Sequence, residues 1–266
     1  MKIFDSHFHI IDPRFPLSPN DGYLPEPFTC ADYLRRMEGV ALAGGAVVSG
    51  SFQGFDQGYL KAALAELGPR FVGVTQLPAG ATDEEILALD AAGVRAVRFN
   101  LRRGGSETLE KLETLAWRVH RLARWHVELY VDARELPPLA GRLVRLPAVS
   151  IDHLGLSREG FPTLLRLAER GVRVKATGFG RGDLDVPRAL RDLCAANPDG
   201  VMFGTDLPST RAPVPYRDED LQRVQDALDE DQARKVLCDN ALAFYRPRAA
   251  ASSSPVSSPQ AKGEAS

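Results

Sequence analysis

The feature that most constrains this chain is a regular alternation of short apolar runs with helical segments. Eight such runs recur along the sequence, each bounded by glycine, proline or polar residues. This order is typical of a parallel sheet closed into a single (β/α)₈ TIM barrel, an α/β fold. A doubly wound open sheet is the alternative, but no Gly-x-Gly-x-x-Gly follows any strand. The predicted strands are 3–10, 46–50, 71–75, 94–99, 128–132, 148–153, 172–177 and 201–205.

Local signals set several boundaries between these strands. Thr82 and Glu85 have the spacing of a capping box and open a helix that Gly93 ends. The segment 106–125 is the longest predicted helix, and we expect its two tryptophans in the core. The proline-rich segment 13–28 predicts a long loop after the first strand, of the kind that covers a functional site.

The end of the chain differs in composition from the rest. Residues 1–247 carry the barrel pattern, whereas 248–266 consist mainly of alanine, serine and proline. Such a sequence lacks the apolar residues needed to build a core. We therefore predict one barrel domain, 1–247, followed by a disordered low-complexity tail, 248–266.

Charge and cysteine usage exclude several classes of protein. A net charge of −2 offers no basic surface for nucleic acid or for an anionic membrane. The sequence has neither a run of eighteen apolar residues nor a signal-peptide core after Lys2. Its three cysteines are dispersed and odd in number, so we expect buried free thiols and a cytoplasmic location. A small molecule is the expected partner, and the oligomeric state is not encoded.

Reactive side chains gather where the predicted strands end. His7 and His9 lie two residues apart on one strand and therefore point to the same face. Barrel enzymes carry their chemistry at the carboxyl ends of the strands. Titratable groups at several such ends indicate a functional site there: His7 and His9, Arg98, Tyr130, Asp152 and His153, Lys175, and Asp206.

Ordered motifs at these ends resemble a known family. The segments 7–9, 151–155, 174–178 and 203–208 are similar to the amidohydrolase superfamily. Together with 50–56 and 93–100, they resemble its amidohydrolase-related branch of lactonases, which includes 2-pyrone-4,6-dicarboxylate lactonase and sugar lactonases. The resemblance spans residues 2–246. It implies a catalytic role for His7, His9, His153 and Asp206.

The resemblance leaves the metal open. Metal-dependent members of the superfamily usually add a lysine on strand four or a histidine on strand five, where this chain has Arg98 and Tyr130. A binuclear site is therefore not expected. One Zn²⁺ or Mn²⁺ held by His7, His9 and Asp206, with or without His153, suits these donors. A metal-free centre, as in the dicarboxylate lactonase, is the equal alternative.

The resemblance implies hydrolysis of a lactone, or of a related ester or amide. Asp206 would take a proton from water and return it to the leaving oxygen. His153, with His7 and His9 or a metal that they bind, would polarise the carbonyl. One alternative is metal-dependent non-oxidative decarboxylation on the same barrel. Another is a metal-dependent nuclease, which would need more histidine and glutamate ligands and a basic groove than this sequence has. The third is a non-catalytic binding barrel.

Other polar residues are candidates for binding substrate. Arg98 is the expected partner of a substrate carboxylate because it belongs to a strand and a guanidinium matches two oxygens. Tyr130 and Ser51 can add hydroxyl contacts. Lys175 is expected inside the barrel beside an acid, in a structural or a functional role. The remaining assignments are Arg102, Arg103 and Arg181 as solvated loop charges, and His120 and His126 as surface or packing residues.

Overall fold

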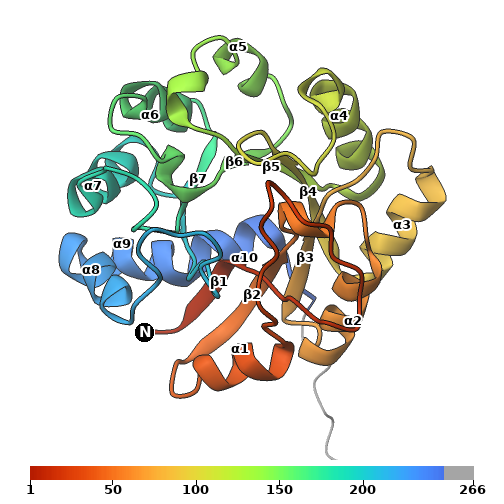
Figure 1. Cartoon of the computed structure of the whole chain (residues 1–266). Helices are drawn as coiled ribbons and strands as arrows, with labels where there is room; N and C mark the ends of the chain where they lie inside the picture. The colour runs from red at the N-terminus through yellow and green to blue at the C-terminus, as the bar shows by residue number, and fades with distance from the viewer. Residues whose placement is uncertain (249–266) are drawn as a thin grey trace, which may run out of the picture.

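A computed structural model describes residues 1–248 as a barrel of eight parallel strands in sequential order, surrounded by helices (Figure 1). The predicted (β/α)₈ fold is confirmed. Residue 248 apart, the predicted tail lies outside the described residues. The strands are β1 Ile3–Phe8, β2 Leu42–Val48, β3 Phe71–Thr75, β4 Val94–Asn100, β5 His126–Tyr130, β6 Val149–Ile151, β7 Arg173–Ala176 and β8 Val201–Phe203.

The helices follow the predicted order, with a short addition between β5 and β6. They are α1 Cys30–Arg36, α2 Gly58–Leu67, α3 Asp83–Ala92, α4 Leu112–Ala123, α5 Ala140–Leu143, α6 Phe161–Glu169, α7 Val186–Ala196, α8 Glu219–Ala227, α9 Glu230–Arg234 and α10 Asn240–Tyr245. Single turns of 3₁₀ helix are η1 Ser51–Gln53, η2 Leu109–Lys111, η3 Ala133–Glu135 and η4 His153–Gly155, and η5 Lys235–Asp239 is a turn of π-helix.

Side-chain caps explain where two helices begin. The Thr82 hydroxyl accepts from the Glu85 backbone N–H, and the Glu85 carboxylate accepts from the Thr82 N–H, so the predicted capping box of α3 is confirmed. Gly93 ends α3 in the left-handed region, at φ 107°. Thr29 and Asp32 form an equivalent box on α1.

Backbone hydrogen bonds after β8 join the last strand to the first. Asp206 N–H donates to the His7 carbonyl and His9 N–H donates to the Leu207 carbonyl, both at 2.7 Å. Gly204 permits this approach, because a Cβ there would lie 2.6 Å from the His7 nitrogen. His7 on β1 and His9 just after it are thereby fixed against Asp206.

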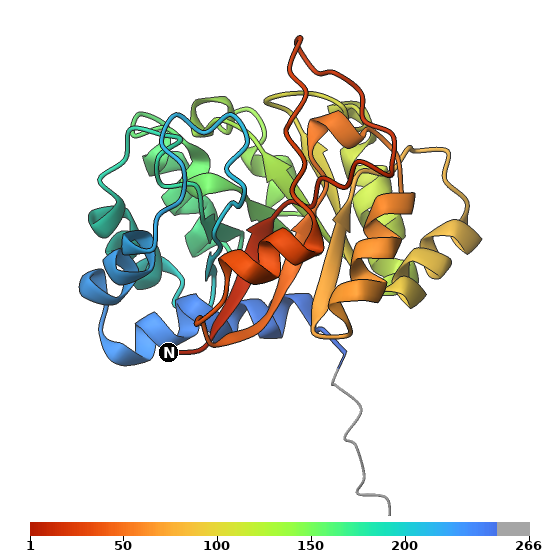
Figure 2. The same cartoon turned by 60° about the horizontal axis from the view of Figure 1, so that its bottom comes forward.

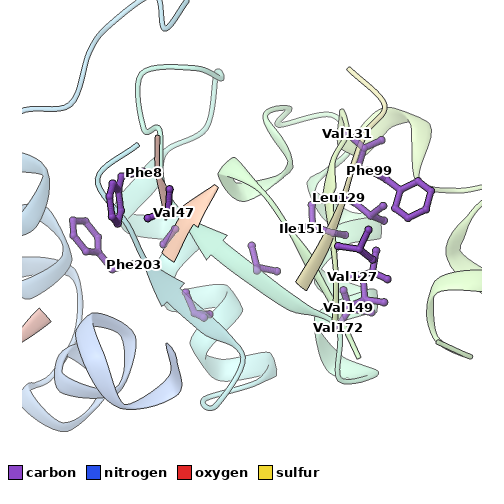
Figure 3. Close-up of a cluster of buried hydrophobic side chains, with 14 of the residues drawn as sticks. Phe8, Val47, Phe99, Val127, Leu129, Val131, Val149, Ile151, Val172 and Phe203 are labelled. Carbon is purple, nitrogen blue, oxygen red and sulfur yellow. The ribbon is translucent and has the colours of Figure 1, made fainter. Parts of the chain in front are cut away.

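Two apolar layers hold the barrel together. Strand side chains such as Val127, Leu129 and Ile151 pack outward toward the helices (Figure 3). A second cluster fills the interior beside β1 to β4 and the base of the barrel, where α10 contributes Phe244 and Tyr245. Ionisable residues occupy the rest of the interior, fully buried: Arg98, Glu128, Asp152 and Lys175.

Two assignments from the sequence are wrong in position. Trp117 on α4 is 52% exposed, not in the core, whereas Trp125 is buried as predicted. β5 begins at 126 rather than 128, so His126 lies inside the barrel against Glu128; of the two positions expected for it, surface or packing, it takes the second. The three cysteines are buried free thiols, as predicted.

The two ends of the barrel carry different elements. The long loop 13–28, red in Figure 2, stands over one end, and the blue helix α10 crosses the other. None of the described helices is both long and apolar enough to cross a membrane.

Candidate active site

The four predicted catalytic residues converge beneath the loop end of the barrel. The His7 ring lies 5.1 Å from the His9 ring and 4.8 Å from the His153 ring, centre to centre. Nε2 of His7 is 3.9 Å from Oδ1 of Asp206. All four residues are buried. Convergence of this kind is expected of a reactive centre and argues against a binding barrel with dispersed polar residues.

Strained backbone holds two of these side chains in place. His153 has φ 53° and Asp206 has φ 63°, both in the left-handed region that non-glycine residues seldom adopt. Gly178 at φ 57° faces them, and a Cβ there would lie 2.8 Å from His153 Nδ1. Such strain is typical of functional sites, where surrounding contacts maintain it.

Partners of the imidazoles orient each ring. His9 Nδ1 donates to the Val48 carbonyl at 2.7 Å, which leaves Nε2 as an acceptor. His153 Nδ1 lies 2.7 Å from the Thr177 hydroxyl. When that hydroxyl donates, Nε2 of His153 carries the ring hydrogen and serves as a donor.

Asp206 is paired on one oxygen only. Its Oδ2 accepts from Arg181 Nε at 2.5 Å, while Oδ1 has no hydrogen-bond partner among the described residues. Arg181, which the sequence placed among solvated loop charges, is therefore a buried ion-pair partner. Its Nη2 also donates to the Thr210 carbonyl at 2.9 Å, which ties the loop after β7 to the loop after β8.

Arg98 is likewise committed within the protein. It donates to Oδ2 of Asp152 at 3.2 and 2.8 Å and to the Ser49 carbonyl at 2.7 Å. Its guanidinium carbon lies 5.4 Å from the centre of the Tyr130 ring. A substrate carboxylate would therefore share Arg98 with Asp152.

A narrow cavity of about 30 Å³ opens above the histidines, roughly the room of one or two water molecules. Ser51 and Tyr130, the two candidates for hydroxyl contacts, line it beside His9, Arg98 and His153. Arg102, by contrast, is exposed, as predicted. The sequence did not identify the other polar residues on the wall as site residues: Tyr23, Asn100, Arg103, Arg181, Thr210 and Arg211.

Asn20 of the long loop connects that wall. Its side-chain oxygen accepts from the Ser51 hydroxyl at 3.0 Å and from Arg211 at 2.9 Å. Its amide nitrogen donates to the Arg103 carbonyl at 2.9 Å. The proline-rich composition of 13–28 is the sequence feature that predicted a covering loop here.

Burial controls the charge of the histidines. It lowers the pKa of His9 and of His153 well below the usual histidine value, and neighbouring cationic groups act in the same direction. It also lowers the pKa of His7, in spite of the nearby Asp152 carboxylate. The three imidazoles are therefore neutral at pH 7.

Three of these side chains have donors suited to a divalent cation. One ligand atom from each of His7, His9 and Asp206 lies within 4.8 Å of the other two. Nε2 of His7 and Oδ1 of Asp206 are buried and have no hydrogen-bond partner among the described residues. Two nitrogens and one carboxylate fit Zn²⁺ or Mn²⁺. The Arg181 guanidinium already places one positive charge beside the Asp206 carboxylate.

Comparisons with known proteins agree with this architecture. The sequence model of the amidohydrolase family matches residues 4–246. A 2-pyrone-4,6-dicarboxylate hydrolase from Comamonas testosteroni is 27% identical over 91% of this chain and 90% of its own length. A D-galactarolactone isomerase from Agrobacterium fabrum is 27% identical over the same shares.

Solved structures share the fold. An Agrobacterium tumefaciens protein, solved without ligand, superposes with a TM-score of 0.80 at 24% identity, over 92% of this chain and 96% of its own. A probable 2-pyrone-4,6-dicarboxylic acid hydrolase from Acinetobacter baumannii, with citric acid bound, gives 0.78 at 21% identity, over 92% and 100%.

Proposed function

This chain belongs to the amidohydrolase family, and from that premise we propose that it hydrolyses a lactone bearing a carboxylate. The observation that carries the proposal is the free Oδ1 of Asp206, buried beside three neutral imidazoles under an arginine-lined cavity. The two curated relatives, a dicarboxylate hydrolase and a lactone isomerase by name, support a lactone as the substrate class.

Water activation falls to Asp206 and His9. Oδ1 of Asp206 and Nε2 of His9 are both acceptors, and together they orient the two hydrogens of one water molecule. A water donating to both through hydrogen bonds of about 2.8 Å suits these two residues, which have ligand atoms within 4.8 Å of each other. Asp206 takes the proton as water attacks the carbonyl and later gives it to the leaving ring oxygen. Arg181 on the other oxygen fixes the carboxylate for both steps.

Carbonyl polarisation falls to His153. With the Thr177 hydroxyl donating to Nδ1, Nε2–H of His153 donates to the lactone carbonyl oxygen. The charge that develops on that oxygen is stabilised more strongly in this buried site than in water. A neutral imidazole suits this role, because its N–H is a much weaker acid than that of an imidazolium and keeps its hydrogen throughout the reaction.

A substrate carboxylate finds its partner at the cavity wall. Arg103 is the arginine there whose guanidinium makes neither an ion pair nor a hydrogen bond among the described contacts. Arg98 and Arg181 each hold a protein carboxylate, and Arg211 donates to Asn20. Tyr130 and Ser51 add hydroxyl groups, and Arg98 reinforces the positive charge beside Tyr130. These side chains favour an acidic lactone over a neutral one.

A divalent cation, when bound by His7, His9 and Asp206, would act as a Lewis acid toward the carbonyl or the water. The steps assigned above to Asp206, His9 and His153 use only side chains of this chain. Metal analysis of the purified protein, with assays in the presence and absence of a chelator, distinguishes metal-assisted from metal-free hydrolysis.

The test is a panel of acidic and neutral lactones assayed in water enriched in ¹⁸O. We expect ring opening of an acidic lactone with one label entering the new carboxylate. Product without label, as in isomerisation, or release of carbon dioxide would overturn the hydrolase assignment.

Asp206→Asn provides the second test. The amide keeps the shape of the side chain and cannot take the proton, so kcat/KM should fall at least about 10³-fold. Asp132→Asn is the matched control: Asp132 also pairs with an arginine after a strand, but it is not among the side chains that converge with His7 and His9. Hydrolysis by Asp206→Asn at the rate of the control would remove Asp206 from the mechanism.

A further inference from the structure

The ammonium of Lys175 lies directly beneath His7. Both side chains are fully buried, and Nζ is 3.4 Å from Nδ1 of the imidazole. The same ammonium donates to the Glu128 carboxylate and lies 5.6 Å from the centre of the Tyr245 ring. Lysine is therefore both a structural ion-pair partner and a neighbour of the reactive centre.

A carboxylate competes for the same nitrogen. Oδ1 of Asp152 is 3.6 Å from Nδ1 of His7 and 3.6 Å from Nζ of Lys175. An ammonium only donates, so its bond to Nδ1 requires a lone pair there. A carboxylate only accepts, so its bond to Nδ1 requires a hydrogen there. Which of these two bonds to Nδ1 forms determines which nitrogen of His7 carries the ring hydrogen.

The available hydrogen-bond partners favour the bond from Lys175 to Nδ1 of His7. After Glu128 takes one of its three hydrogens, His7 Nδ1 at 3.4 Å and Asp152 Oδ1 at 3.6 Å are the acceptors for the others among the described contacts. A hydrogen on Nδ1 would face the ammonium and leave one of its donors buried without a partner, which is unfavourable. A hydrogen on Nε2 instead faces Oδ1 of Asp206 across 3.9 Å, and these two atoms otherwise lack partners.

We propose that Lys175 is a positioning residue that holds His7 in the tautomer with its hydrogen on Nε2, directed at Asp206. In that form His7 holds the free oxygen of Asp206 in place beside His9. Ligation of a metal through Nε2 needs the opposite tautomer, with the hydrogen on Nδ1 and Asp152 as its acceptor. Lys175 therefore weakens metal capture by His7, His9 and Asp206.

The variant that tests this role is the double substitution Lys175→Met with Glu128→Gln. It removes one positive and one negative charge together, so the net charge of the barrel interior is unchanged. The introduced amide keeps an oxygen for the Tyr245 hydroxyl, which donates to Glu128 at 2.5 Å in the natural protein. Glu128→Gln alone is the matched control, because it retains the lysine.

Nitrogen chemical shifts of ¹⁵N-labelled histidine report the tautomer at pH 7.5, with the His7 signals identified by their loss in His7→Gln. We expect hydrogen on Nε2 in the natural protein and in Glu128→Gln, and hydrogen on Nδ1 in the double variant. Hydrogen on Nδ1 in the natural protein overturns the assignment by itself, whether or not any variant folds. An unchanged tautomer in a folded double variant does so as well.

Zinc titration of chelator-treated protein by calorimetry gives a second readout. We expect Zn²⁺ to bind the double variant at least tenfold more tightly than it binds Glu128→Gln. Equal affinities would show that Lys175 does not weaken metal binding at this site. Circular dichroism confirms that the compared proteins are folded. Neither readout uses a lactone, so failure here is distinguishable from failure of the proposed hydrolysis.

Discussion

The arginines around the cavity differ in what they already bind. Arg98 and Arg181 each hold a buried carboxylate, and Arg211 donates to Asn20 and lies over the Tyr23 ring. The guanidinium of Arg103 has no partner of this kind among the described contacts. Recruiting a committed arginine weakens an existing ion pair, so an incoming carboxylate interacts most favourably with Arg103.

Arg103→Met tests this difference. For an acidic lactone we expect KM to rise about tenfold or more with little change in kcat, because a charge-assisted contact made in both ground and transition states is lost. A neutral lactone should be unaffected. The matched control is Arg102→Met at the exposed neighbouring position. Equal losses in the two variants, or an equal loss for both lactones, would contradict the assignment.

For single residues, the sequence predicted the positions of strand side chains better than those of loop side chains. Two histidines spaced two residues apart on a strand must share a face. A residue just after a barrel strand must lie at the carboxyl-terminal end of the barrel. Arg181 is on a loop, and no local pattern indicates that its side chain turns inward to Asp206. Its burial depends on contacts between loops that are distant in sequence.

At the scale of elements, the loop after β1 closes the site through one residue. Asn20 bonds side chains or backbone from the loops after β2, β4 and β8: Ser51, Arg103 and Arg211. The cavity of about 30 Å³ is smaller than any lactone with a carboxylate, so substrate entry requires this loop or its arginines to move.

Asn20→Ala should loosen the loop. Loss of these hydrogen bonds, at about 1 kcal/mol net each, favours the open form, and we expect protease cleavage within 13–28 to accelerate about tenfold. Glu26→Ala, in the same loop at an exposed position, is the control. Cleavage of Asn20→Ala at the control rate would show that Asn20 does not hold the loop closed.

Helix periodicity explains the misplaced tryptophan. Leu112, Leu115 and Val119 recur at three- and four-residue spacing and are buried on one face of α4. Trp117 is two residues from both Leu115 and Val119, which at 100° per residue places it on the opposite, exposed face. Size and hydrophobicity alone suggested the core; the spacing indicated otherwise.

For the whole molecule, the barrel interior is a balance of buried charge. Arg98 and Lys175 face Glu128 and Asp152, so the four charges cancel. Burial raises the pKa of the Asp152 carboxyl, but the charges of Lys175 and Arg98 outweigh it and hold that pKa well below the usual range. The sequence predicted an acid beside Lys175, but not which one, because the side chains of β5, β6 and β7 meet inside the barrel only in the folded sheet.

Buried neutral histidines make the stability of this barrel depend on pH. Burial lowers the pKa of His126 to about 4, despite its hydrogen bond to Glu128. The unfolded chain takes up that proton near pH 6.5, so the stabilisation present above this pH is lost as pH falls toward 4. Between pH 7.5 and 5.5 this one group should cost about 1 kcal/mol of unfolding free energy. His7, His9 and His153, whose pKa values are also lowered by burial, add to the loss in the same direction.

Urea unfolding at pH 7.5 and pH 5.5 measures this loss. His126→Gln should reduce the difference between the two pH values by about 1 kcal/mol, whatever its effect at either pH alone, because one proton-binding site is removed from the unfolded chain. His120→Gln, at a half-buried position on α4, is the control for removing a histidine from the outside of the barrel. If His126→Gln retains the full pH difference of the natural protein, then His126 takes up its proton equally in both states, and burial inside the barrel does not hold it neutral.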